Sequence, residues 1–145
     1  MRAMMRFLMS ILCLSVGLCY AATESVVGTW QTVDSSGTPT SYVKTTVQNG
    51  QLTGKITKML RNAEGVVPTQ CTQCTGEEHN QPLVGMRVLW GFTQQGMSWE
   101  NGQILAPKTG KIYDAAIMPS QNGKMLTITI HAGFFSQTQV WQRVE

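Results

Sequence analysis

The clearest structural signal in the chain is the stretch Lys124-Met125-Leu126-Thr127-Ile128-Thr129-Ile130-His131, which follows directly after Asn122-Gly123. Leu126, Ile128 and Ile130 alternate with polar residues, so they lie on one face of an extended strand and the polar residues on the other. Asn-Gly is typical of a two-residue turn between paired strands, because both residues tolerate positive φ. The stretch therefore predicts one half of a hairpin with a buried face.

The same pattern of short strands and turns recurs along the chain. Further turn pairs are Ser36-Gly37, Asn49-Gly50, Gln95-Gly96, Asn101-Gly102 and Thr109-Gly110. We expect strands at residues 28–33, 40–48, 51–60, 86–93, 97–100, 103–105, 111–118, 124–131 and 134–144. No segment after residue 21 keeps a helical period. The sequence predicts an all-β, mostly antiparallel domain.

So many short strands in one small domain must stack or close to hide their edges, which leaves a sandwich or a barrel. Glycines inside strand patterns, at Gly54, Gly91 and Gly102, favour a barrel, because sharply bent sheets use glycine at corners. A second indication is Gly28-Thr29-Trp30 in the first strand and Trp141-Gln142-Arg143 in the last. In a closed meander these strands are neighbours, so Arg143 could cover Trp30 at a seam formed by Gly28, Trp30, Trp141 and Arg143. The alternative is that the two tryptophans are ordinary core residues.

The N-terminus predicts export. Arg2 and Arg6 precede an apolar run over residues 7–18, and Cys19-Tyr20-Ala21 follows with small residues at Cys19 and Ala21. This is the layout of a secretory signal peptide, and the run is shorter than the roughly 20 residues that span a membrane. We expect cleavage after Ala21, a signal peptide at residues 1–21 and one domain at residues 22–145, periplasmic or secreted, with no transmembrane segment. The alternative is an uncut N-terminal anchor.

The charge balance argues against nucleic acid as a partner. Removing Arg2 and Arg6 from the eleven basic residues leaves nine, against eight acidic residues. The sequence after residue 21 has no run of basic residues, which phosphate backbones attract. We therefore expect no nucleic-acid binding.

The pair Cys71-Thr72-Gln73-Cys74 has three interpretations. A redox dithiol needs its first cysteine at a helix N-terminus, and the segment that follows has no helical pattern and contains Glu77 and Glu78. A zinc site could use Cys71, Cys74 and His79, but structural zinc takes four protein ligands. The third is a disulfide, which suits an exported chain and would stiffen the loop. The sequence favours the disulfide, with no metal and no cofactor.

No set of residues indicates catalysis. The chain lacks a Gly-x-Ser-x-Gly elbow and has only two histidines, His79 and His131. Glu77 and Glu78 are adjacent in a loop, and Glu100 and Asp114 have no evident partner at the spacing of a glycosidase pair. We expect a protein that is not an enzyme.

Aromatic residues in the second half of the chain suggest a binding site. An eight-stranded barrel is just wide enough for side chains or one small ligand, and small-molecule sites have apolar walls with a few polar groups. The residues predicted to line such a site are Tyr42, Arg87, Trp90, Phe92, Trp99, Tyr113, His131 and Phe134. The alternative is that aromatic rings fill the barrel.

Several motifs together resemble the DUF2147 family of exported bacterial proteins, over nearly all of the expected domain. They are Gly28-Thr29-Trp30, residues 49–56, Cys71-Thr72-Gln73-Cys74, residues 82–86, Leu89-Trp90-Gly91, residues 101–105 with Pro107 and Gly110, and residues 138–143. The Gly-x-Trp start and the late Arg also resemble the lipocalin and calycin barrels. The resemblance implies a lipocalin-like up-and-down barrel and brings no settled activity.

Three functions follow as hypotheses, the third being an enzyme with a metal bound at Cys71, Cys74 and His79. The first is an exported barrel that binds a small apolar or amphipathic ligand in its interior. The second is a structural or interaction module of the cell envelope, with a filled core, which docks on a protein partner through the loop from Cys71 to Pro82.

Overall fold

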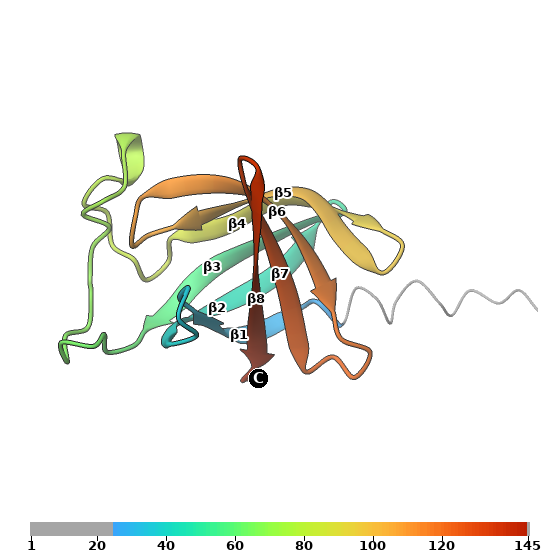
Figure 1. Cartoon of the computed structure of the whole chain (residues 1–145), viewed down its shortest axis with the longest axis horizontal. Coiled ribbons are helices and arrows are strands. Elements are labelled where there is room, and N and C mark those ends of the chain that lie inside the picture. Colours follow the sequence, from blue (N-terminus) through green and yellow to red (C-terminus); the bar gives the residue numbers. More distant parts are fainter. Residues whose placement is uncertain (1–24, 145) are drawn as a thin grey trace, which may run out of the picture.

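The computed structural model describes residues 25–144, so the predicted signal peptide lies outside the described residues. Within them the chain forms eight strands and one short 3-10 turn (Figure 1). The strands are β1 (Gly28–Val33), β2 (Pro39–Gln48), β3 (Gln51–Met59), β4 (Arg87–Gln95), β5 (Ser98–Ala106), β6 (Lys111–Pro119), β7 (Met125–Ala132) and β8 (Phe135–Arg143). The 3-10 turn η1 (Gly76–Glu78) lies in the long loop between β3 and β4.

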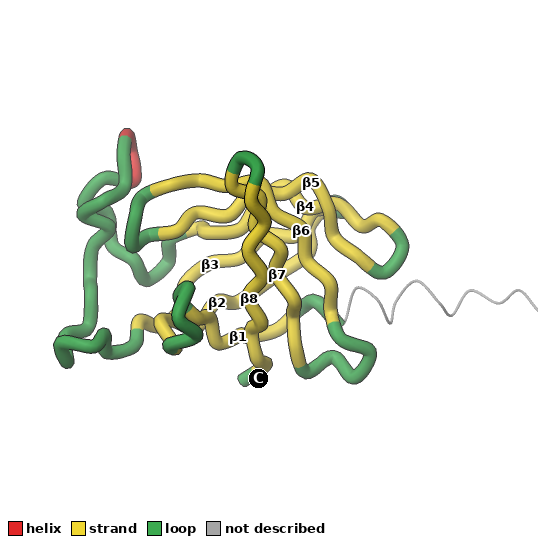
Figure 2. The backbone as a smooth tube through the Cα atoms, viewed as in Figure 1, coloured by secondary structure: helices red, strands yellow, loops and turns green. Residues whose placement is uncertain are grey.

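The strands close into one antiparallel barrel in simple up-and-down order, which confirms the predicted fold class and excludes a sandwich. Each strand pairs with the next, and β1 pairs with β8 to complete the ring. Closure rests on a short seam, because only Trp30 and Gln31 of β1 have partners in β8, namely Arg143 and Gln142. Figure 2 shows the strands curling round with the loops gathered at the two ends.

The predicted turn at Asn101-Gly102 is wrong. One strand, β5, runs through it and pairs with β6 on both sides, with an irregularity between Trp99 and Gly102. Gly102 is needed here for space: a Cβ at this position would overlap the ring of Phe92 inside the barrel. The Asn-Gly pair therefore marks a bent strand at this site and not a hairpin.

The turns alternate between the two ends of the barrel, as they must in a meander. We call the end with the β2–β3, β4–β5 and β6–β7 turns the closed end, and the end with the β1–β2, β3–β4, β5–β6 and β7–β8 connections the open end. The closed half holds the largest fully buried side chains, among them Trp30, Phe92 and Trp99. These rings fill the interior at that end.

Arg143 seals the closed end. Its guanidinium lies 4.3 Å from the centre of the Trp30 ring and donates hydrogen bonds to the backbone carbonyls of Gly123, Val27 and Ser25. The seam that the sequence predicted therefore brings Trp30 and Arg143 together across β1 and β8. A planar cation with several fixed donors suits both contacts at once.

Candidate functional site

The open half differs from the closed half in how its inward-facing side chains meet solvent. Ile130 of β7 pairs with Gln137 of β8, so the two share the inner face. Ile128, one layer deeper, is fully buried, whereas Gln137 is exposed and Tyr113 of β6 is only half-buried. The inner surface at this level is therefore open to solvent.

The first half of β8 is also free on its other edge. Its pairing with β1 is limited to Gln142 and Arg143, so among residues 25–144 the segment from Phe135 to Val140 pairs only with β7. Phe134 in the turn is fully exposed and Phe135 is 78% exposed. The β7–β8 hairpin thus stands out from the rest of the barrel, and its turn is the red loop at the top centre of Figure 1.

Buried hydroxyls lie at the end of β1 that is not covered by β8. The hydroxyl of Thr32 is 2.7 Å from that of Ser41 and 2.8 Å from that of Thr40. Thr32 and Ser41 are both buried. They give the open half polar groups that face inward.

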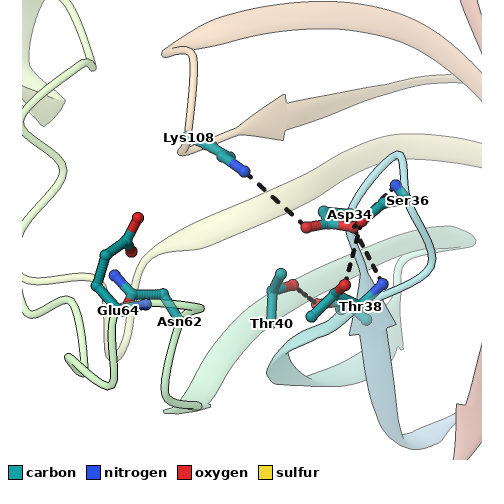
Figure 3. Close-up of polar contacts among 8 residues, drawn as sticks. Asp34, Ser36, Thr38, Thr40, Asn62, Glu64 and Lys108 are labelled. Carbon is teal, nitrogen blue, oxygen red and sulfur yellow. Dashed lines mark hydrogen bonds and ion pairs between the residues drawn. The ribbon is translucent and has the colours of Figure 1, made fainter.

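Asp34 organises the β1–β2 turn at the open end. One carboxylate oxygen accepts hydrogen bonds from the backbone N–H groups of Ser36 and Thr38 and from the Ser36 hydroxyl, and Lys108 of the β5–β6 turn lies 3.9 Å from the other (Figure 3). The hydrogen bonds from the Ser36 side chain and the Thr38 backbone lower the pKa of Asp34 below its usual value of 3.8. The contact ties two connections of the open end to each other.

Comparison with known proteins places this chain in a family. The model of a family described as an uncharacterized protein conserved in bacteria (DUF2147) matches residues 28–143. The chain belongs to the DUF2147 family. No match was found among curated proteins.

A solved structure shares the fold of this DUF2147 chain. It is described as protein HP1028 from the human pathogen Helicobacter pylori, which belongs to the lipocalin family. The two are 20% identical, with a TM-score of 0.70, and the match covers 83% of each chain. Because only 20% of the residues are identical, the likeness shows the shared fold alone, which is a lipocalin-like barrel.

The eight residues predicted to line a ligand site do not come together in the DUF2147 barrel. Phe92 and Trp99 are fully buried in the closed half. Tyr113 faces inward in the open half, and Phe134 lies at the exposed hairpin tip. The others, on the outer face, are Tyr42, Arg87, Trp90 and His131. Alternation along a strand sends neighbouring residues to opposite faces, and the register of each strand cannot be read from aromatic content.

Cys71 and Cys74 form a disulfide, with their Cα atoms 5.4 Å apart, which confirms that prediction. Both residues are buried, so the loop packs on the barrel. His79 lies with Nδ1 2.9 Å from the carbonyl oxygen of Cys74. Between residues 25 and 144 no three His, Cys, Asp or Glu side chains are grouped closely enough to hold a metal ion. In the same range no helix is long and apolar enough to cross a membrane.

Sequence reasoning missed the residues that define the open half and a hollow on the outer face. Gln137 and Ile130 become partners only through the β7–β8 register. The hollow has a volume of about 570 Å³ and is lined by Thr29, Tyr42, Lys44, Thr57, Lys58 and Val144. Of these, Tyr42 alone is among the residues predicted to line a ligand site. Alternation in β2 could have shown that Lys44 shares a face with Tyr42, but not which residues of β3 lie beside them.

Proposed function

We propose that this protein is an exported barrel that binds a small amphipathic molecule at the open end. The observation that carries the proposal is the exposure of inward-facing Gln137 and Tyr113 directly above a buried apolar layer. A ligand there could place an apolar part against Ile130 and Tyr113 and a polar part against the amide of Gln137. Small-molecule sites combine apolar walls with a few polar groups in this way.

The closed half limits how deep such a ligand can go. Trp30, Phe92 and Trp99 occupy the interior at that end, so the proposed site is shallow. The hydroxyls of Thr32 and Ser41 lie near the gap between β1 and β8 and offer further hydrogen bonds. The lipocalin-like fold supports the binding of a small ligand in general terms.

The test is native mass spectrometry of the processed protein purified from its own host, followed by titration of any co-purified molecule. We expect Tyr113→Ala and Ile130→Gln to weaken binding at least tenfold. Thr129→Gln, on the outer face of the same strand as Ile130, is the matched control and should bind normally. Equal binding by all variants, or no bound molecule and no binding of short-chain amphiphiles, would overturn the proposal.

A second function is favoured by the rigidity of the Cys71 to Pro82 loop. The backbone N–H of Cys71 donates to Gln81, the N–H of Asn80 donates to Cys71, and Gln70 bridges to Pro82. Gly110 of the β5–β6 turn lies directly against the loop, since a Cβ there would overlap the carbonyl oxygen of Gln73. A fixed loop of this kind suits docking on an envelope protein.

Deleting this loop would remove buried Cys71 and Cys74, so a surface change gives the cleaner test. Glu77 and Glu78 are exposed on η1. We expect Glu77→Lys combined with Glu78→Lys to abolish capture of a partner from envelope extracts, while Glu64→Lys, elsewhere in the β3–β4 connection, leaves capture unchanged. Unchanged capture by the double variant would remove this function.

A further inference from the structure

Three basic residues stand in a row across the outer face of the sheet. Lys44 of β2 pairs directly with Lys55 of β3, and Lys55 pairs with Arg87 of β4. All three are exposed. Lys44 and Lys55 each lie between inward-facing, buried residues of their strands, so they point outward. We call Lys44, Lys55 and Arg87 the basic row.

In the absence of a bound anion, this arrangement lowers the folding stability of the protein. Like charges directly opposite each other on neighbouring strands are destabilising. Over residues 25–144 the ion pair that is found joins Lys108 to Asp34 and does not involve the row. Arg87 is the best accommodated of the three, because it stacks 5.0 Å from the centre of the Trp90 ring and shares a small hollow with Glu78. For Lys44 and Lys55 no ion pair and no ring contact is found within residues 25–144.

The hollow of about 570 Å³ lies beside the row and adds a fourth cation, Lys58. The Lys58 ammonium is 5.5 Å from the centre of the Tyr42 ring, across the β2–β3 pair. The remaining lining residues include the hydroxyls of Thr29 and Thr57. The volume falls within the range of small-molecule sites, and ammonium groups with nearby hydroxyls are suited to an anion.

We propose that this hollow binds the phosphate group of a small phosphate ester, held by Lys44 and Lys58 with Lys55 adding to the positive field. Lysine is a compact point charge that binds phosphate from several directions. An anion there relieves the repulsion between Lys44 and Lys55, so the same contacts that bind the ligand stabilise the sheet. The site is on the outer face of the sheet, whereas the ligand site proposed above faces inward, so the two proposals do not depend on each other.

The row is too short for a nucleic acid. Neighbouring strands are about 5 Å apart, so Lys44 and Arg87 are separated by only about 10 Å across the sheet. Proteins that bind nucleic acid through its backbone make about 6–10 phosphate contacts. Phosphate esters of the required size occur as lipid headgroups at a membrane surface and as free soluble molecules, and the experiment must separate these sources.

The test uses the processed protein in two arms. The first titrates glycerol 3-phosphate and follows backbone amide shifts by NMR. The second measures co-sedimentation with vesicles of phosphatidylglycerol and phosphatidylcholine, compared with phosphatidylcholine alone. Binding in the first arm identifies a soluble ester, and binding in the second arm alone identifies a headgroup. Absence of binding in both arms overturns the proposal.

Charge-matched variants show whether binding is site-specific. We expect Lys44→Gln combined with Lys58→Gln to weaken binding at least tenfold. Lys111→Gln combined with Lys124→Gln removes the same charge from β6 and the β6–β7 turn, and should change binding less than twofold. Equal weakening by both double variants would show attraction by net charge and would overturn the site.

A stability measurement adds an independent readout. Glycerol 3-phosphate, or phosphatidylglycerol vesicles if only the second arm binds, should raise the Tm of the wild-type protein and leave that of the Lys44→Gln, Lys58→Gln variant unchanged. In the absence of ligand Lys55→Gln should raise Tm, because it removes the central charge of the row. A lower Tm for Lys55→Gln contradicts the repulsion on which the inference rests.

Discussion

The two halves of the barrel are built differently although they share the same strands. The closed half is filled by large rings and fastened by Arg143, which contacts Trp30 and three backbone carbonyls. In the open half the inward side chains are smaller or polar, and β8 loses its partner on one side. We infer that packing in the closed half supplies most of the folding stability, and that the open half can therefore remain exposed to solvent. Mutations in each half test this division of roles.

Trp30→Ala should cause the largest loss. It removes a fully buried ring, and large-to-small changes of this kind cost about 4 kcal/mol of unfolding free energy. Phe135→Ala, in the open half, removes a ring that is 78% exposed and should cost less than about 0.5 kcal/mol. Urea unfolding followed by circular dichroism measures both. Similar losses would contradict the division.

Gly102→Ala tests the packing of the closed half directly. A Cβ would overlap the Phe92 ring, so we expect a loss of about 3 kcal/mol from overpacking. Adding Phe92→Leu should recover part of this loss, because the smaller side chain makes room at the same spot. A double variant whose loss equals the sum of the two single losses would show that the contact is not the cause. The measurement is the same unfolding experiment.

Thr45→Val isolates the polar part of the closed half. The Thr45 hydroxyl accepts hydrogen bonds from Trp30 Nε1 and the backbone N–H of Gly28, and the carbonyl oxygen of Val26 lies 2.7 Å away as its acceptor. The valine variant keeps the shape and leaves two donors without their partner, which should cost about 2.5 kcal/mol. Thr45→Ser keeps the hydroxyl and should lose clearly less. Denaturant melts that rank the two variants in the opposite order would exclude this account.

Replacing both Cys71 and Cys74 by Ala should affect mainly the open half. Closing so short a loop stabilises by about 2 kcal/mol in the chain-entropy model. Hydrogen exchange should speed up in the β3–β4 loop and the β5–β6 turn, while amides beside Trp30 and Phe92 stay protected. Loss of protection throughout the barrel would show that the disulfide supports the whole fold.

Asp34→Asn should have the smallest effect, because Asp34 is at the surface. Its pKa is lowered in the folded state, so the carboxylate contributes stability above its usual value of 3.8, and this contribution disappears as pH falls through the folded pKa. Wild type should therefore be slightly more stable than Asp34→Asn at neutral pH, and the difference should vanish in acid. An NMR titration of Asp34 with a midpoint above 3.8 would contradict the assignment.

Local sequence predicted the fold because turns and alternation are local signals. Seven of the eight strands fall close to where the pattern placed them, and β5 was divided because Asn101-Gly102 has the residues of a hairpin turn. What prevents a turn there is the Phe92 ring, which comes from another strand. The disulfide could also be predicted, since the expected export of the chain and the spacing of Cys71 and Cys74 both favour it.

The site was harder to predict because it depends on register. Aromatic content predicts ligand contacts, although Phe92 and Trp99 are buried in the core. The basic row cannot be recognised in the sequence, because Lys44, Lys55 and Arg87 are far apart along the chain. It arises because β2, β3 and β4 pair in one particular register. Register is set by cross-strand packing over the whole sheet, which single segments do not encode.

Arg143 also brings the two ends of the described chain to one place, since its guanidinium reaches the carbonyl oxygen of Ser25. A short linker could therefore join them, and new termini could be opened near Asn62 in the β3–β4 loop without cutting a strand. Such a circular permutant should keep the barrel. For the same reason, tethering the natural protein to a sensor surface by either end leaves Tyr113 and Gln137 facing the solution.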